Sequence, residues 1–578
     1  MQRTQAFSRD PNNTQAWLVG SGISSLTAAL HLIKDAKVPG PSIHIIDTHD
    51  GSGGGMRTEG SEESGYFLPY DCTPHFHGRS IERLLSLIPS VSDPDKSIME
   101  TINTREDKTS PVSTSQANTE ATHEAGNQFH GSIIERLFHS GAHPSVVSSA
   151  RHYAPLAQFV TGGDSGPEVS HHTHPHLSLN QRMVLIGFML EHESALVGKS
   201  IEEVFDVDFF KTGFWKLWAT VFGLKPGHSA VEFQRHLRKY LGDLKSLKNL
   251  QRTDYNLVES VIEPLTAYLQ QQGVDFRFHQ QVTDLKLYPE GGPTTVSQIE
   301  VMTESGVQEL ITLDPVDILI VSLGSTSAGV SLGSDSTPPD GLTADWEEVM
   351  DGDWRLWEKL CQKSTKFGNP MNFLPRVMES TIETFTTTFK GRELNALYKR
   401  ITNENPGTGS LLSLSESNWG ITISIPNQPV FSTQSADVTV LLGHALNAAA
   451  KGNYIKKDMW LCTGQEILKE VLFHLGCSAD SAEGAAILAT AKTIPCGLPL
   501  GNAPFLTRGP GDRPPVIPKW TTNIACVGQF VEIPGDTTLE LDYKVHSAQI
   551  AVAELMGLPV EPVKPVKSLL LEVMNVLL

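Results

Sequence analysis

The N-terminal part of the chain alternates between short apolar runs and one amphipathic stretch. Residues 16–19 form an apolar run that stops at Gly20-Ser21-Gly22. From residue 23 to residue 36 apolar side chains recur every three or four positions, which predicts a helix with one buried face. A second apolar run, residues 43–46, ends at Asp47. The pattern therefore predicts a strand, a glycine turn, a helix and a second strand that ends in an acid.

In a unit of this kind the turn and the acid have separate tasks. Gly20 allows a tight turn, and Gly22 allows backbone N–H groups to approach a pyrophosphate at the helix N-terminus. Asp47 can accept a hydrogen bond from a ribose hydroxyl and disfavours a 2′-phosphate. Ser25 stands at the third glycine position of the motif, and Gly53-Gly54-Gly55 is a second glycine turn. We predict a bound dinucleotide, with FAD favoured over NAD because the unit opens a long chain, although such turns also occur without a ligand.

Two later apolar strands are expected to return the chain to this unit. One ends at Gly324-Ser325 and the other at Gly528-Gln529, before a helix from residue 543 to residue 556. We therefore predict an α/β fold with an FAD-binding Rossmann-type domain built from discontinuous segments. These segments are residues 1–100, 273–335 and 490–558.

The remaining segments differ in pattern. Helical spacing predicts a helical region at residues 181–272, and mixed helix and strand patterns predict a substrate domain of mixed α+β type at residues 336–489. Residues 103–180 are polar and poor in aliphatic side chains, so we expect a loop or disordered insert there. We read the histidines at residues 171–176 as part of a solvated loop and predict no metal site. Residues 559–578 form an amphipathic C-terminal tail.

Composition narrows the class of protein. The chain has 578 residues, which is too long for one hydrophobic core. A net charge of −20 disfavours nucleic acid as a partner. The six cysteines are scattered without a paired motif, and the N-terminus lacks an apolar secretory segment, so we expect a cytoplasmic protein. The tail could lie in a membrane interface, contact a partner subunit or pack on its own domain, and the sequence leaves these alternatives open.

Several sequence blocks together carry a resemblance to a known family. They are GSGISSLTAALHLIKD, FWKLWATVFGLKPGHSAVE, ESNWGITISIPNQPVF, GNYIKKDMWLCTGQEI and VGQFVEIPGDTTLELDYKVHSA. By these blocks, spread over nearly the whole chain apart from residues 103–180, the protein resembles the oleate hydratase family, also called the myosin-cross-reactive antigen family. The resemblance implies an FAD domain, a helical region, a substrate domain and a homodimer. It also implies addition of water to an unsaturated fatty acid without net redox change.

The glycine motifs and the resemblance together predict the residues that contact FAD. They are Gly20, Gly22, Ser24, Ser25, Asp47, Gly53, Gly54, Gly55, Arg57, Val282, Gly324, Ser325, Gly528, Gln529 and Thr537.

The chain departs from the family at the positions that carry the reaction. The family's water-activating carboxylate falls on Thr73, and its proton-donating tyrosine falls on His236. The residues that hold the fatty-acid carboxylate fall on Leu257, Ser424, Pro426 and Val430. Of these four only Ser424 could donate a hydrogen bond from its side chain. The resemblance therefore implies the family's scaffold without its catalytic pair or its carboxylate anchor.

Other residues near these positions could support acid–base chemistry. The resemblance places Asp71, His75 and His77 in the segment that contacts flavin and substrate, and we expect His236 to face them. A histidine with a pKa near neutrality can donate or accept a proton, and an aspartate can partner it. Hydration, double-bond isomerisation or cyclisation of an apolar unsaturated molecule, such as a fatty acid, polyketide or terpenoid, would follow. A flavin oxidoreductase, a non-catalytic FAD-binding relative and a structural role for His236 remain open.

Overall fold

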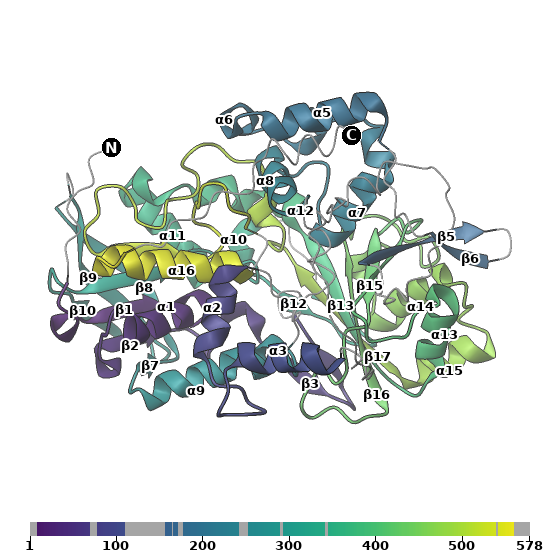
Figure 1. The fold of residues 1–578 in the computed structure, drawn as a ribbon, viewed down its shortest axis with the longest axis horizontal. Helices are drawn as coiled ribbons and strands as arrows, with labels where there is room; N and C mark the ends of the chain where they lie inside the picture. Colours follow the sequence, from purple (N-terminus) through teal and green to yellow (C-terminus); the bar gives the residue numbers. More distant parts are fainter. Residues whose placement is uncertain are drawn as a thin grey trace, which may run out of the picture.

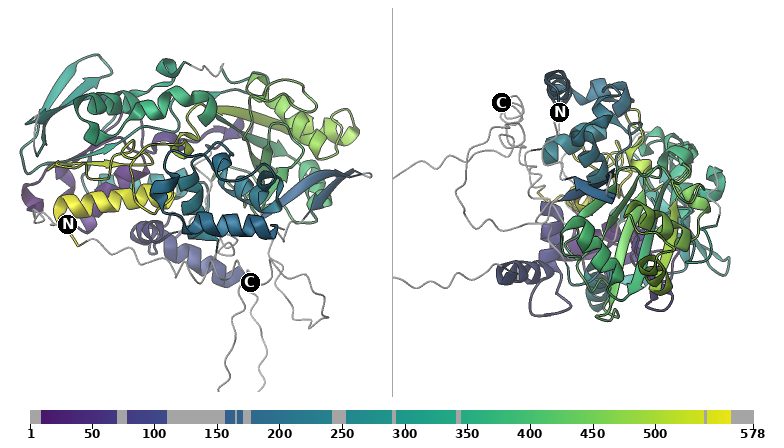
Figure 2. Two further views of the ribbon diagram at one scale, coloured as in Figure 1. Left: turned by 90° about the horizontal axis from the view of Figure 1, so that it is seen from above. Right: turned by 90° about the vertical axis from the view of Figure 1, so that its right-hand side faces the viewer.

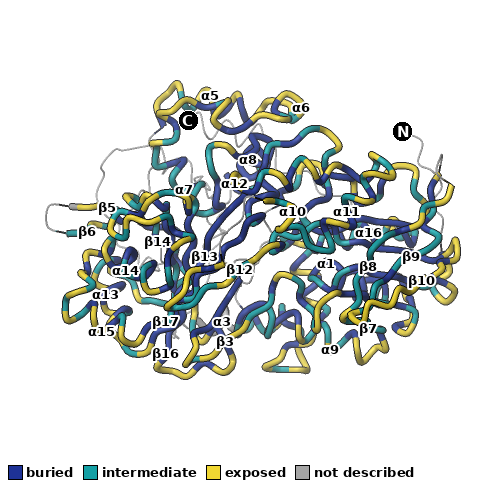
Figure 3. The backbone as a smooth tube through the Cα atoms, turned by 180° about the vertical axis from the view of Figure 1, so that it is seen from behind, coloured by how far each residue is buried: buried dark blue, intermediate teal, exposed yellow. Residues whose placement is uncertain are grey.

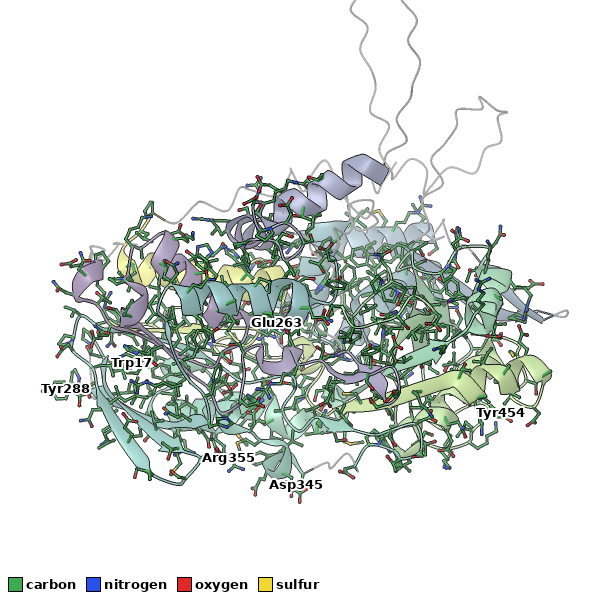
Figure 4. The ribbon with its side chains drawn as sticks, turned by 90° about the horizontal axis from the view of Figure 1, so that it is seen from below. Trp17, Glu263, Tyr288, Asp345, Arg355 and Tyr454 are labelled. Carbon is green, nitrogen blue, oxygen red and sulfur yellow. The ribbon has the colours of Figure 1, made fainter. Side chains whose placement is uncertain are left out.

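The computed structural model describes residues 9–69, 78–109, 156–163, 166–170, 177–241, 253–289, 293–340, 345–538 and 541–559. Two large β-sheets lie along the long axis of the molecule, with a group of helices on one side (Figure 1). Trp17 of the first sheet region and Tyr454 near the second sheet lie toward opposite ends (Figure 4).

The first sheet has five parallel strands drawn from distant parts of the chain. Its order is β18 (Ile524–Val527), β11 (Ile318–Ser322), β1 (Ala16–Val19), β2 (Ile43–Ile46) and β7 (Asp275–Arg277). Every residue of β1 and β18 is buried, because these short apolar runs are covered on both faces. The predicted Rossmann-type fold is thereby confirmed.

Helices cover this sheet and share its core. Helix α1 (Ile23–Lys34) packs against α16 (Leu541–Met556) and α9 (Glu263–Gln271), and α16 also contacts α2 (Arg79–Leu87), which is followed by α3 (Ile98–Thr109). An antiparallel sheet of β8 (Gln280–Tyr288), β9 (Thr295–Thr303) and β10 (Gln308–Thr312) carries α11 (Gly352–Lys363), which follows α10 (Trp346–Val349).

The second sheet is mixed and has eight strands. Its order is β12 (Ser331–Leu332), β17 (Ala491–Leu498), β13 (Ile382–Lys390), β16 (Val438–Ala445), β15 (Ile421–Ser424), β14 (Leu411–Leu414), β5 (Ala157–Gly163) and β6 (Gly166–Ser170). Strand β13 runs through the buried interior, and all its residues except Lys390 are buried (Figure 3). Helices α13 (Glu393–Thr402), α14 (Gly464–His474) and α15 (Ala482–Thr490) flank this sheet.

A short hairpin ties the two sheets together. It consists of β3 (Glu59–Ser61) and β4 (Gly65–Phe67). The backbone N–H of Tyr66 donates to Thr388 Oγ1 of β13 at 2.8 Å, and the N–H of Leu68 donates to Thr386 Oγ1 at 3.2 Å. The threonine hydroxyls thus satisfy backbone donors that the hairpin would otherwise bury unpaired.

The helical group has a core of its own. Helices α5 (Leu179–Leu190), α6 (Glu193–Leu196), α7 (Gly213–Phe222) and α8 (Ala230–Tyr240) enclose aliphatic and many aromatic side chains, including Trp215, Trp218 and Phe233. These helices lie over one side of the molecule (Figure 2). The aromatic side chains of α7 therefore pack in the interior of the helical group.

Short helices occupy many of the connections. They are α12 (Val377–Ser380), the 3-10 turns Pro11–Asn13, Gly40–Ser42, Gly54–Met56, Ile201–Glu203, Phe209–Lys211, Thr365–Phe367, Pro370–Asn372, Leu374–Arg376, Met459–Leu461 and Ala503–Phe505, and one π-helical turn, Val258–Ile262.

The structure moves several of the predicted domain boundaries. Strand β17, which we assigned to the FAD domain through residues 490–558, pairs with β13 in the second sheet. Residues 346–377, assigned to the substrate domain, instead bury Trp354 and Trp357 in the core of the first sheet. Residues 257–271, assigned to the helical region, also join that core. Local periodicity identifies elements but does not determine which sheet they join, and this explains the errors.

The expected loop at residues 103–180 is wrong for its last part. Strands β5 and β6 form a hairpin there, and β5 pairs in parallel with β14 at the edge of the second sheet. The end of α3 also falls within this range. The two strands of the hairpin are short and partly polar, so composition alone did not distinguish an edge hairpin from a loop. The histidines at 171–176 and the tail from residue 560 lie outside the described residues.

A buried charge cluster fastens the helical group to the C-terminal segment. Glu232 on α8 is fully buried, and its Oε1 lies 2.7 Å from Arg508 and 3.3 Å from Arg513. Burial by itself would raise the pKa of Glu232, but the three neighbouring arginines lower it, so the carboxylate is ionised. Arg235 completes the cluster and bonds Glu532 at 2.7 Å.

Glu232→Gln is expected to destabilise the fold by about 3–5 kcal/mol, because it removes the counter-charge of fully buried Arg513 and one of the two that face Arg508. Chemical denaturation of the two proteins, followed by circular dichroism, measures the difference. Glu202→Gln is the matched control, since Glu202 is exposed and its substitution should change stability by less than about 0.5 kcal/mol. Equal denaturation midpoints for Glu232→Gln and the wild type would contradict this account.

Among the described residues, no helix combines the length and apolar character needed to cross a membrane. The five described cysteines are all free thiols.

Candidate functional site

A cavity of about 450 Å³ lies where the first sheet meets the second. The carboxyl ends of β1, β2 and β11 open into it, which is where ligands bind in parallel α/β sheets. Its opposite wall includes Ile382 of β13 and Cys496 and Leu498 of β17. The cavity therefore takes one wall from each sheet.

Most of the residues predicted to contact a dinucleotide line this cavity. They are Gly20, Gly22, Ser24, Asp47, Gly53, Gly54, Gly55, Arg57, Val282, Gly324, Ser325, Gly528 and Gln529. Ser25 and Thr537 are not among the lining residues. Ser25 is fully buried within α1 with its hydroxyl 3.5 Å from the carbonyl oxygen of Val19, and Thr537 is fully buried as well.

The two glycine turns form one cradle. Gly20 has a φ of +89°, a conformation that side chains other than glycine rarely adopt. A Cβ added at Gly54 would lie 3.3 Å from the Cα of Gly22, so the turns are in close contact. A Cβ added at Gly22 meets nothing within 4 Å, which shows that this position faces open space.

The N-terminus of α1 has the properties that a diphosphate requires. Gly22 is the N-cap residue and has no side chain to cap the first turn. The first N–H groups of a helix lack intrahelical partners, and the helix dipole makes this end positive. With the open space at Gly22, these groups suit a pyrophosphate, and the residues present therefore fit FAD.

Asp47 is already engaged by the loops around it. Its Oδ2 accepts hydrogen bonds from the N–H of Ser21 at 2.6 Å and from the Ser21 hydroxyl at 2.7 Å. Its Oδ1 accepts from the N–H and the ring Nδ1 of His49, both at 2.8 Å. Burial alone would raise the pKa of Asp47, but these hydrogen bonds lower it, so the carboxylate stays charged. If Asp47 also binds a ribose hydroxyl, as the sequence predicts, that hydroxyl shares the carboxylate oxygens of Asp47 with the groups that hold the Ser21 turn.

Two further acids, which the sequence pattern did not indicate, line the cavity. Asp351 and Asp353 begin α11, and the pKa of each is raised, by burial first and then, for Asp353, by Asp351 and Asp47. Burial thus favours the protonated form of these carboxyl groups, in which they can donate a hydrogen bond to a ligand. Asp351 caps α11 by accepting from the N–H of Trp354 at 3.1 Å, and this common capping role gave no sign of a cavity.

The far end of the cavity is apolar. Phe67 and Pro69 of the hairpin region face the same space as Ile382 and Leu498. A ligand with a polar diphosphate and a flat apolar ring system matches this change in lining from one end to the other.

His236 lies apart from this lining, on α8 within the helical group. It is fully buried, and its ring centroid lies 4.9 Å from that of Phe222 and 5.9 Å from that of Phe505. Its Nδ1 lies 2.7 Å from the carbonyl oxygen of Glu232. A carbonyl can only accept, so Nδ1 carries the proton of the neutral ring and Nε2 has a lone pair. Nε2 has no hydrogen-bond partner among the described residues.

The structure corrects the expected acid strength of His236. Desolvation by burial lowers the pKa of His236 to about 4, whereas the sequence alone suggested a pKa near neutrality. The ring is therefore neutral between pH 5 and 8 and can accept a proton there. It cannot take over the proton-donating task of a tyrosine.

Asp71, Thr73, His75 and His77 lie outside the described residues, between β4 and α2. Pro69, the last described residue before them, lines the cavity.

The four positions of the expected carboxylate anchor lie at the end of β15, in the segment that follows it, and just before the turn Val258–Ile262. Leu257 and Val430 are both buried in the first core, and the N–H of Asn256 donates to the Val430 carbonyl at 2.8 Å. Ser424 ends β15 opposite Leu442, and the Pro426 carbonyl accepts from Gln428. None of the four lines the cavity described above.

A sequence model of the MCRA family matches residues 13–133 and 147–553. The chain is 29% identical over 552 residues to an oleate hydratase from Streptococcus pyogenes, which covers 94% of this chain and 85% of that protein. It is 26% identical over 590 residues to a linoleate hydratase from Lactiplantibacillus plantarum, which covers 95% of this chain and 94% of that protein. An oxidoreductase from Methanosarcina mazei superposes with a TM-score of 0.45 at 9% identity, covering 93% of this chain and 99% of that chain. This last likeness is too low to carry an argument.

Proposed function

Because the chain belongs to the MCRA family, we propose that it is an FAD-dependent enzyme of the oleate hydratase type. It performs acid–base chemistry without net redox change on an apolar unsaturated substrate. The outcome is hydration, double-bond isomerisation or cyclisation.

One observation carries the proposal. The cavity joins a glycine cradle and an acidic end, which suit a dinucleotide, to an apolar end at β13 and β17. Gly20, Gly22 and the Gly53–Gly55 turn would hold the diphosphate at the N-terminus of α1. Bound FAD would supply structural and electrostatic support for the reaction. The names of the two hydratase relatives support the choice of reaction class.

The protein's own side chains divide the proton transfers between them. In the proposal His236 accepts a proton at Nε2, because Nδ1 is held by the Glu232 carbonyl. The proton donor then comes from Asp71, His75 or His77. Leu257 and Val430 leave an apolar surface where the family holds a carboxylate, so the substrate is neutral at that end.

This assignment fixes the pH dependence of the reaction. His236 acts as a base, so its active form is present above its pKa of about 4 and is lost as the pH falls through that value. With respect to His236, we expect kcat/KM to stay flat from about pH 5.5 to 8. A loss of rate on the acidic side should appear only near pH 4.

His236→Phe should abolish turnover and leave flavin in place, and pH–rate profiles with flavin absorbance measure both. Full activity in His236→Phe would assign the residue a purely structural role.

The reaction class itself is tested by mass spectrometry. FAD-loaded protein is incubated with a panel of unsaturated fatty acids, polyketides and terpenoids in H₂¹⁸O. A product that gains labelled water indicates hydration, and an isobaric product indicates isomerisation or cyclisation. Flavin bleaching by NADH or by substrate, with an oxidised or reduced product, would instead identify an oxidoreductase. Unchanged substrates throughout the panel together with unreactive flavin would favour a non-catalytic relative.

A further inference from the structure

A second cavity, of about 470 Å³, lies on the other side of the start of β13. Thr381 lines this cavity, whereas its neighbour Ile382 lines the dinucleotide cavity. The remaining wall comes from the loop between α7 and α8, from α12, and from residues 446–450 after β16. The anchor positions Ser424 and Pro426 lie toward the opposite end of β16, because β15 and β16 are antiparallel.

This cavity contains a lysine that has no acidic partner in the part of the chain that the structure describes. Lys225 Nζ donates to the Thr381 carbonyl oxygen at 2.9 Å, and no carboxylate of the described residues lies within 4 Å of it. The nearby acid Glu379 is held by Arg376, whose Nε donates to both its oxygens at 3.1 Å. Burial lowers the pKa of Lys225 to about 8, so the amine is still mostly protonated at neutral pH. Its charge is therefore left uncompensated.

A histidine beside it offers a second donor. His228 is 2% exposed, and its Nδ1 accepts the backbone N–H of Lys225 at 3.1 Å. Burial first, and then Lys225 and Arg376, hold the pKa of His228 well below its usual range, so the ring is neutral. With Nδ1 as acceptor the proton sits on Nε2, and this N–H has no partner among the described residues. A buried donor without an acceptor is costly, which makes an acceptor from a ligand favourable.

The rest of the lining is mainly apolar. It includes Met378, Leu446, Trp460, Leu506 and the alanines at positions 448–450. Met378 is 57% exposed, so apolar surface continues from the cavity to the outside. The volume lies within the range of about 300–1,000 Å³ that small-molecule sites occupy.

We propose that this cavity is a second ligand site, which binds a small molecule with a carboxylate at one end and an apolar body. Lys225 Nζ and the Nε2–H of His228 donate to the carboxylate, and the apolar body lies along Leu446, Trp460 and Leu506. Charge-assisted hydrogen bonds of this kind are the strong ones in protein sites. The site is separate from the proposed reaction and does not depend on which product that reaction yields.

Decanoate and decanol are the probes, titrated by calorimetry into the FAD-loaded protein. We expect decanoate to bind at least about tenfold more tightly than decanol, because only the carboxylate uses both donors. Lys225→Met keeps the apolar stem and removes the charge, so decanoate affinity should fall about tenfold or more while decanol affinity is unchanged. Lys225→Arg should retain most of the affinity. Lys199→Met, at an exposed lysine that does not line the cavity, is the matched control and should bind like the wild type.

Equal decanoate affinity in the wild type and in Lys225→Met would overturn the inference, including the case in which decanoate binds only in the other cavity. An equal loss in Lys199→Met would also overturn it, since a general charge effect would then suffice. Decylamine gives a measurement that needs no variant. It has the same apolar body with a positive head, and binding of decylamine as tight as that of decanoate would exclude a carboxylate site at Lys225 and His228.

Discussion

The Gly22→Val variant is expected to be purified without flavin. It should lack the flavin absorbance bands that we expect of the wild-type protein. Gly22 faces the open space at the N-terminus of α1, where an added Cβ meets nothing within 4 Å. The branched side chain of valine would fill the space that a pyrophosphate needs to reach the backbone N–H groups. The same open space means that the substitution should disturb the rest of the fold little. Loss of flavin can therefore be separated from loss of folding.

Gly187→Val is the matched control for this experiment. Gly187 also has nothing within 4 Å of an added Cβ, but it is exposed on α5, far from the cradle in the sequence and absent from the cavity lining. It should retain full flavin occupancy. Circular dichroism and thermal unfolding verify that both variants are folded. Stoichiometric flavin in Gly22→Val would show that the cradle does not hold the diphosphate.

Oleate is expected not to be hydrated at a measurable rate. By the resemblance described above, the family's water-activating acid is expected to correspond to Thr73, which has no basic group to offer. The family's proton donor is expected to correspond to His236, whose neutral ring donates its only N–H, at Nδ1, to the Glu232 carbonyl. General acid and base groups typically contribute about 10²–10⁴-fold each, so losing both removes several orders of magnitude.

The binding of oleate is expected to be weakened as well. Leu257 and Val430 are buried apolar residues at two positions of the family's carboxylate anchor. Burying an unpaired carboxylate against them would cost several kcal/mol. The assay is formation of hydroxystearate from oleate by FAD-loaded protein, with the oleate hydratase of Streptococcus pyogenes as the positive control. Comparable turnover would contradict the prediction and show that the correspondence with Thr73 is wrong.

Local pattern was sufficient for the elements that bind through their backbone. The run at residues 16–19, the turn at Gly20 and the helix from residue 23 are contiguous, so one stretch of sequence contains the whole cradle except Gly53–Gly55. Strands β11 and β18 were recognised because a strand buried on both faces reads as an uninterrupted apolar run. Most predicted contact residues line the cavity for this reason.

Local pattern could not predict the residues whose role depends on burial and on neighbours from other parts of the chain. Asp351 and Asp353 look like ordinary residues at the start of a helix until α11 is placed beside the cavity. The His236 side chain looks like a neutral-pH titrating group until its burial among aromatic rings is known. Lys225 and His228 carried no motif at all, and only the approach of β13 and α12 encloses them in a cavity.

The sequence by itself determined the parallel sheet and the glycine cradle, and its resemblance to the family predicts the departures at Thr73 and His236. These depend on residue type, on spacing within one strand or turn, and on aligned blocks. Only the tertiary structure decided that β17 and β5 join the second sheet, that Asp47 holds the Ser21 turn, and which nitrogen of His236 carries the proton. Strand partners, desolvation and hydrogen-bond direction arise from contacts between residues far apart in the chain, and no local pattern encodes them.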